Sequence, residues 1–152
     1  MNGFDFDKFV YPELNEETNE YEGELDYIDE NITTRKGIDV SKFQGDINWN
    51  KVKNDGVEFA IIRVGYRGYE TGKIVEDEKY KDNIEGCNEV GIDAGVYFFT
   101  EAKTEAEGRE EAEFVIDLIK DYDIKMPVVI DVEESANTSK SRTRKLTPEE
   151  GS

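Results

Sequence analysis

The chain has 152 residues, enough for one domain of ordinary size and too few for two. Its 37 acidic side chains outnumber its 19 basic ones, and the resulting formal charge of -18 at pH 7 repels the phosphate backbone of nucleic acids. We therefore expect no nucleic-acid partner. The apolar runs are strand-sized, much shorter than the about 20 residues that cross a bilayer, so we expect no membrane span.

The chain contains no histidine and a single cysteine, Cys87. Without histidine it cannot form a Ser-His-Asp triad, a Cys-His pair or a His-ligated metal site. One cysteine excludes an intramolecular disulfide, and its place in a predicted helix favours a packed thiol over a reactive one. Proton transfer near neutral pH must then depend on carboxylates, tyrosine or lysine.

Residues 1–36 hold eleven acidic side chains against three basic ones. Their aromatic residues follow no sustained period of 2 or 3.6, so the segment is predicted to be an acidic leader or linker, disordered rather than compact. A partner-binding tail is the alternative. The first residues lack the basic start and apolar middle of a secretory signal, so we expect no signal peptide in this chain.

Residues 37–152 form the predicted domain, in which short β-branched and aromatic runs alternate with longer amphipathic stretches. This order favours an α/β fold with parallel strands and right-handed crossovers. Strands are predicted at residues 37–41, 57–64, 94–99 and 127–132, helices at 46–52, at 77–90 and from Thr104, and a glycine-rich loop at 65–72.

Local signals mark where the predicted helices begin and end. Gly56 and Gly91 suit left-handed caps at the ends of the first two helices. Thr104 and Glu107 match the capping box that begins a helix. Thr147 offers another N-cap just before the sequence stops, so the domain looks truncated at its C-terminal side, with four strands where a closed (β/α) barrel needs eight.

The last predicted strand is almost wholly apolar, as expected of a parallel strand covered on both faces, and it ends in two acids. Asp131 and Glu133 are two residues apart, so both side chains should face the same way at the strand end where ligands gather. Asp39 places a third carboxylate inside an apolar strand. Such acids can cleave a glycosidic bond, because one carboxyl delivers a proton while another stabilises the positive charge on the sugar.

Two other interpretations use the same acids. Asp131 and Glu133 can be solvated loop residues, or they can bind Mg²⁺ or Ca²⁺ through oxygen. No calcium loop or phosphate-binding loop accompanies them, so no metal site is predicted.

Aromatic residues could supply the apolar surface on which a sugar ring packs. Tyr66 and Tyr69, in the loop after the second predicted strand, and Tyr97, in the third, are candidates for substrate binding. Arg63 could hold a carboxylate in its charged form or cap a strand. Packing in the core is favoured for Phe98 and Phe99, and also for Trp49, which should anchor its helix against the sheet.

Together these segments resemble glycoside hydrolase family 25, the Chalaropsis-type lysozymes, over most of residues 37–146. Four blocks in family order make the resemblance specific. The blocks are Gly37-Ile38-Asp39-Val40-Ser41-Lys42-Phe43-Gln44-Gly45 followed by Ile47-Asn48-Trp49, then residues 59–68, residues 91–99 and residues 127–133.

The resemblance implies a TIM-like barrel, of which this chain holds about the first four βα units. It also implies hydrolysis of the β-1,4 bond between N-acetylmuramic acid and N-acetylglucosamine in peptidoglycan, without a metal or organic cofactor, outside the cell or in the cell wall. In the family, the residue matched by Glu133 is the proton donor, and Asp39 and Asp131 match the accompanying acids. A glycan-binding module without turnover, or an inactive fragment, is the alternative function; metal-dependent phosphoester chemistry is a third.

Overall fold

The computed structural model describes residues 6–23, 26–27, 31 and 33–133. The chain separates into two compact units, Met1–Arg35 and Lys36–Ser152, which are described one at a time. Within the described residues, no helix is long and apolar enough to cross a membrane.

The first unit contains a short 3-10 helix and two antiparallel strand pairs. In the pair formed by Glu13–Asn15 and Glu20–Glu22, the Asn15 side chain accepts hydrogen bonds from the backbone amides of Glu17 and Thr18 at 3.0 and 3.2 Å, which stabilise the turn between the two strands. Tyr11 and Leu14 are exposed. That residues 1–36 form a disordered leader stays a prediction. The elements are η1 (Phe6–Lys8), β1 (Phe9–Val10) paired with β4 (Asp26–Tyr27), and β2 (Glu13–Asn15) paired with β3 (Glu20–Glu22).

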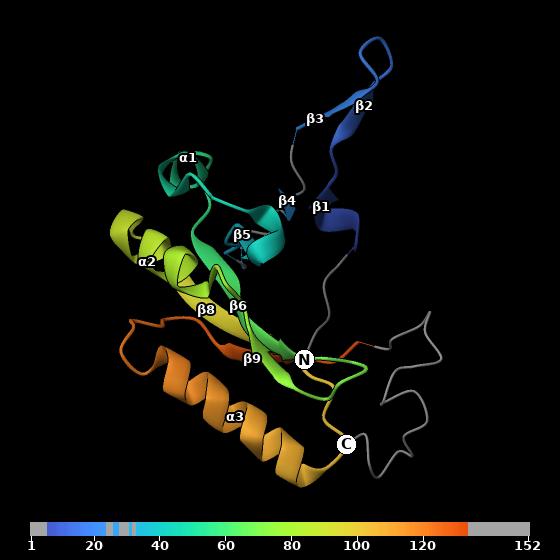
Figure 1. Ribbon diagram of the computed structural model, residues 1–152. Helices are drawn as coiled ribbons and strands as arrows, with labels where there is room; N and C mark the ends of the chain where they lie inside the picture. The colour runs from blue at the N-terminus through green and yellow to red at the C-terminus, as the bar shows by residue number, and fades with distance from the viewer. Residues whose placement is uncertain (1–5, 24–25, 28–30, 32, 134–152) are drawn as a thin grey trace. The chain divides into compact units, whose positions relative to one another are not determined.

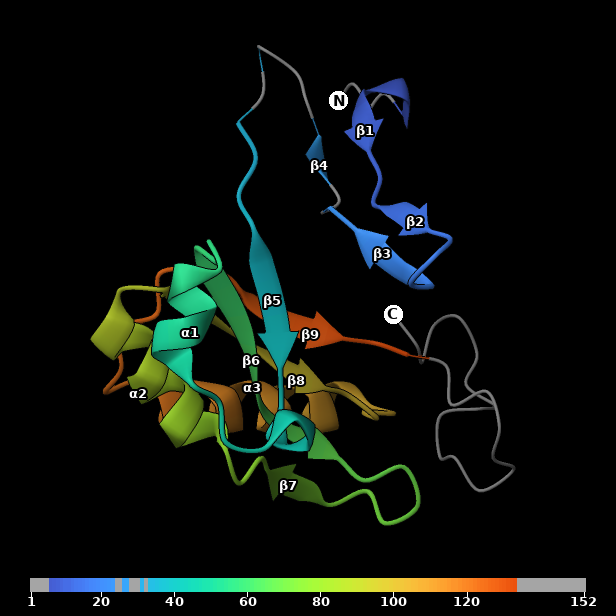
Figure 2. The ribbon, with the colours of Figure 1, turned by 90° about the horizontal axis from the view of Figure 1, so that it is seen from above.

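The second unit is built on a sheet whose four parallel strands lie side by side in chain order (Figures 1 and 2). A mixed α/β fold with parallel strands is therefore confirmed. The parallel strands are β5 (Gly37–Val40), β6 (Phe59–Arg67), β8 (Asp93–Phe99) and β9 (Val128–Asp131); β7 (Ile74–Glu76) pairs antiparallel with β6, and the helical segments are η2 (Lys42–Gln44), α1 (Trp49–Asn54), α2 (Tyr80–Val90) and α3 (Glu105–Ile119).

Side-chain caps explain where the helices begin. Asn48 accepts a hydrogen bond from the Lys51 amide, so α1 starts three residues later than residue 46. Thr104 caps α3 as predicted, by accepting from the Glu107 amide at 3.2 Å. The other half of the predicted capping box is wrong, because Glu107 accepts from the Lys103 amide rather than from Thr104.

The hydrophobic core lies between one face of the sheet and the helices. In β6 and β8, alternate side chains are almost fully buried on this face, among them Ile62 and Phe98. The ring of Phe114 in α3 meets that of Phe98 edge to face, with centroids 5.9 Å apart. Phe98 is thus in the core as predicted. Phe99, the next residue, is only partly buried, because alternation along a strand turns it to the other face.

The end of the sheet at β9 differs from the prediction. Val128, Val129 and Ile130 are 41–49% exposed, although an apolar parallel strand was expected to be covered on both faces. Among the described residues, no strand pairs with the outer edge of β9 and no helix follows it, which explains the exposure.

The prediction of a loop over residues 65–72 is wrong at its start, because β6 continues through Arg67 and its last residues pair with β7. Gly65 permits this path: a Cβ there would lie 2.6 Å from the Val75 carbonyl oxygen and 2.9 Å from the Phe114 ring. The loop is thus reduced to the connection between two paired strands.

Trp49 is buried, as predicted, and its ring lies against Gly86 of α2. We expect Gly86→Ala to destabilise the fold by about 1–3 kcal/mol, because the new Cβ would lie 2.1 Å from Trp49 Cδ1. Urea denaturation measures the change. Gly108→Ala in α3 is the matched control: nothing lies within 4 Å of its Cβ position. That variant should gain about 0.5–1 kcal/mol from helix propensity. Equal changes in the free energy of unfolding for the two variants would contradict the packing of Trp49 against Gly86.

Cys87 lies on α2 with no exposed surface, and burial raises the pKa of its thiol to about 12. At pH 8 we expect a disulfide reagent to modify the native chain at least about 100-fold more slowly than the chain in denaturant, because the thiolate is the reacting form. Equal rates would show that the thiol is accessible, contrary to the packed environment described above.

Candidate active site

The sheet has a second face, opposite the helices, and two of the predicted acids lie on it. Asp39 in β5 pairs with Ile61 in β6, and Arg63, two residues further, pairs with Tyr97 in β8. Paired residues share a face, and so do residues two apart in one strand. Asp39, Arg63 and Tyr97 therefore lie on one face.

The same argument extends to the fourth strand. Tyr97 pairs with Val129 in β9, and Asp131 follows two residues later, so Asp131 also lies on this second face. Asp39 is exposed and Asp131 partly buried. Glu133 follows just after the strand ends and is exposed. We call this surface, defined by Asp39, Arg63, Tyr97 and Asp131, the acid-bearing face.

Tyr97 lies between the two aspartates in strand order. Burial raises the pKa of its phenol; the Arg63 guanidinium opposes this effect, and the negative charges of Asp39, Asp77 and Asp131 raise the pKa further. The phenol therefore remains neutral at physiological pH and can donate a hydrogen bond to a carboxylate or to a sugar oxygen.

An irregularity in β6 brings Tyr66 to the same face. Arg63 pairs with Tyr97, but the next pair in the register is Gly65 with Phe98, so β6 has one extra residue here. After this bulge Tyr66 pairs with Phe99, which in turn pairs with Asp131. Without the bulge, Tyr66 would face the helices. Hydrophobic periodicity alone does not reveal this change of face.

Arg63 is held by a carboxylate that the sequence did not single out, Asp77. The Asp77 side chain is completely buried and accepts from Arg63 Nε at 2.9 Å. It also accepts from the backbone amides of Lys42 at 3.0 Å and Lys79 at 2.9 Å. Of the two roles predicted for Arg63, holding a carboxylate is therefore the one observed. The signal for Asp77 was weak, since it is one of many acids just before a helix.

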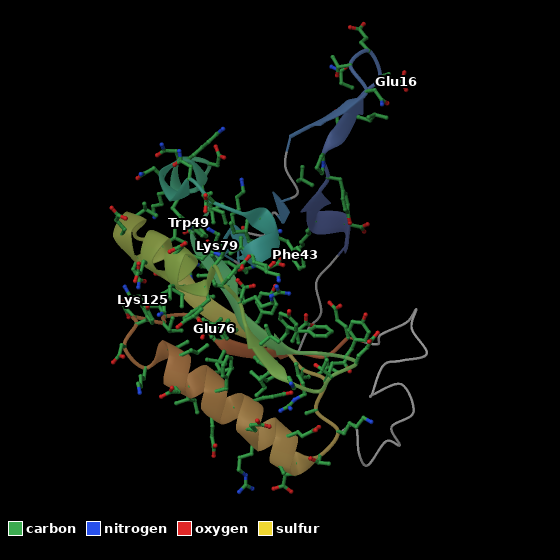
Figure 3. All side chains as sticks on the ribbon, viewed as in Figure 1. Glu16, Phe43, Trp49, Glu76, Lys79 and Lys125 are labelled. Atoms are coloured by element: carbon green, nitrogen blue, oxygen red, sulfur yellow. The ribbon has the colours of Figure 1, made fainter. Side chains whose placement is uncertain are left out.

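A group of cations and aromatic rings surrounds Arg63. Its guanidinium carbon lies 5.1 Å from the ring centroids of both Phe43 and Tyr66. Lys42 Nζ lies 5.7 and 5.8 Å from the same two rings. These are cation–π distances, so the four side chains form one cluster where β5 passes into η2, the turn that carries Phe43 (labelled in Figure 3).

A second buried ion pair joins the end of β6 to α3. Arg67 Nε donates to Glu111 at 2.7 Å, and both side chains are almost fully buried. Burial disfavours the charged guanidinium, but the hydrogen bonds and charges of Glu111 and Glu110 outweigh it and raise the pKa of Arg67. Thr100, just after β8, donates to the other Glu111 oxygen at 2.5 Å. This network connects the two strand ends beneath the acid-bearing face.

Within the part of the chain that the structure describes, no group of three or more histidine, cysteine, aspartate or glutamate side chains is arranged to hold a metal ion. The predicted helix at Thr147 lies outside the described residues.

Comparison with known proteins identifies one family. The pattern of the family described as "Glycosyl hydrolases family 25" matches residues 38–149. The autolytic lysozyme of Clostridium acetobutylicum is 31% identical over 104 residues, which cover 68% of this chain and 30% of that protein. The chain thus spans less than a third of the length of this curated relative.

Solved structures agree with this assignment. The modular autolysin LytC of Streptococcus pneumoniae, solved in complex with a synthetic peptidoglycan ligand, is 35% identical with a TM-score of 0.59; the match covers 72% of this chain and 26% of LytC. The bacterial lysozyme of Streptomyces coelicolor is 27% identical with a TM-score of 0.59, covering 78% of this chain and 53% of that one.

The Arg63–Asp77 pair yields a stability prediction. Asp77→Asn should cost about 3–5 kcal/mol of unfolding free energy, because it leaves the buried Arg63 charge without its counter-ion. Asp46→Asn is the control, since the Asp46 carboxylate pairs with Lys79 at the surface and is 92% exposed. Its denaturation midpoint should not move measurably. Similar midpoints for both variants would contradict the structural role of Asp77.

Proposed function

The chain belongs to glycosyl hydrolase family 25, and on that premise we propose that it carries the acid-bearing part of a muramidase active site. The reaction is hydrolysis of the β-1,4 bond between N-acetylmuramic acid and N-acetylglucosamine in peptidoglycan. The observation that carries the proposal is the placement of Asp39 and Asp131 on one open face of a parallel sheet, with Tyr97 between them.

In this mechanism Glu133 protonates the leaving glycosidic oxygen. Asp131 and Asp39 stay charged and stabilise the positive charge that develops on the sugar, or on its acetamido group if that group attacks the anomeric carbon. Their position at the carboxyl end of the sheet supports these roles, because substrates of parallel α/β enzymes bind there. Cleavage by carboxyl groups needs no metal or organic cofactor.

Three further side chains are proposed to bind the substrate. Tyr97 remains a neutral hydrogen-bond donor on the face that carries both aspartates. Tyr66 offers an apolar ring beside Phe99 on the same face. Arg63, fixed by Asp77, supplies a positive charge among the acids. We propose that these groups orient a sugar against the three catalytic acids.

We infer that residues 37–152 form the first four βα units of a barrel, preceded by a leader of residues 1–36. The strands follow one another in chain order, and the buried side chains lie on one face only. A doubly wound sheet would bury both faces under helices, whereas the inner face of a barrel meets other strands. The exposed edge of β9 is where a fifth strand would pair.

The proposed substrate is the glycan strand of peptidoglycan, acted on outside the cell or in the cell wall. The solved complex of LytC with a synthetic peptidoglycan ligand supports this substrate, because the match to LytC covers 72% of the present chain.

Substitution of the proton donor tests the proposal. In the protein produced from its complete reading frame, we expect Glu133→Gln to lower the rate of peptidoglycan clearing at least about 100-fold, because glutamine cannot deliver a proton. The release of reducing ends should fall equally, while the circular dichroism spectrum stays unchanged.

Glu113→Gln provides a matched control, since Glu113 is exposed on α3 away from the acid-bearing face. This variant should keep full activity. Undiminished lysis by Glu133→Gln would remove Glu133 from the mechanism. Binding to cell walls without new reducing ends in the unmodified protein would instead indicate a binding module.

A further inference from the structure

Phe43 presents an apolar ring to solvent from a rigid turn (Figure 3). Its relative exposure is 76%, the largest among the exposed large hydrophobic residues described. The turn η2 is held by a capping box, in which the Ser41 amide donates to Gln44 Oε1 at 2.6 Å and the Phe43 amide donates to Ser41 Oγ at 3.3 Å. The Lys42 amide donates to buried Asp77. These hydrogen bonds hold the backbone of the turn, while the Phe43 ring does not pack in the core and stays available to a ligand.

The position of Phe43 connects it to the acid-bearing face. Turn η2 follows β5 directly, at the carboxyl edge of the sheet where Asp131 ends β9. The Arg63 guanidinium lies 5.1 Å from the Phe43 ring and belongs to the acid-bearing face. The ring therefore extends that face outward at the edge where a substrate would enter.

Lys42 gives the same place a positive charge. Its ammonium lies 5.7 Å from the Phe43 centroid, the side chain is partly exposed, and no ion pair engages it among the described residues. In a chain of charge -18, an ammonium that engages in cation–π contacts and in no ion pair among the described residues is a local exception. The Phe43 ring and the Lys42 ammonium together suit a ligand that offers both an apolar face and an anionic group.

We propose that Phe43 and Lys42 form a subsite for a sugar that carries a carboxylate. The apolar C–H face of the pyranose packs on the Phe43 ring, and the carboxylate pairs with the Lys42 ammonium. This proposal rests on the proposed function, under which the sugar is a muramoyl unit. The carboxylate then belongs either to the lactyl group or to a peptide attached to it.

Calorimetric binding to the chain at low salt tests the subsite. The ligands are the N-acetylglucosamine–N-acetylmuramic acid disaccharide, the same disaccharide with an attached dipeptide, and chitobiose, which has no carboxylate. We expect Phe43→Ala to weaken binding of all three about tenfold, through loss of the stacking surface. Phe43→Trp should restore it. We expect Lys42→Gln to weaken only the two acidic ligands, about three- to tenfold. The acidic ligand that binds the unmodified chain more tightly identifies the source of the carboxylate.

Ile116→Ala is the control, because Ile116 is also an exposed large hydrophobic residue, 64% exposed on α3, on the helix side of the sheet. It should bind all three ligands unchanged. Any one of three results would overturn the subsite. These are unchanged binding by Phe43→Ala, an equal effect of Lys42→Gln on chitobiose and on the acidic ligands, and no binding by the unmodified chain. The calorimetric assay measures no turnover. Binding that depends on Phe43, in a protein that releases no reducing ends from peptidoglycan in the separate hydrolysis assay, would refute the muramidase proposal and leave the subsite intact.

Discussion

The buried carboxylate of Asp77 is the interaction on which the candidate site depends. It pairs with Arg63 Nε and accepts hydrogen bonds from the backbone amides of Lys42 and Lys79 from one fully desolvated position. A buried charge is tolerated only when it is paired and hydrogen-bonded, so these contacts hold η2, β6 and the start of α2 in one arrangement. Phe43 and Tyr66 then pack around Arg63, which connects the packing of the domain to its proposed sugar site.

The two faces of the sheet separate the hydrophobic core from the proposed site. One face buries aliphatic side chains such as Ile62 and Val96 under α2 and α3, and it provides the hydrophobic stabilisation. The other keeps Asp39, Tyr97 and Asp131 within reach of solvent. A parallel strand can serve both purposes because consecutive side chains point in opposite directions.

Several local features could be predicted because they depend on neighbours in the chain. Thr104 caps α3 because its side chain reaches an amide three residues away, and Gly91 ends α2 because it adopts a left-handed conformation with φ 75°. The resemblance to family 25 and the strand-end acids likewise follow from short segments. The predictions failed where the structure depends on contacts between residues far apart in the chain. Strand β6 extends past Gly65 because β7 and Phe114 pack against it. Strand β9 is exposed because no described strand or helix covers it.

The sequence by itself determined the family, the order of the four parallel strands and the three helices between them, and the candidate acids, since these follow from residue identity and short-range periodicity. Only the tertiary structure decided that Asp77 holds Arg63, that a bulge turns Tyr66 toward Asp131, and that Phe43 stays exposed. The physical reason is that each of these depends on pairing register and burial, which join residues far apart in the chain and leave no trace in local composition.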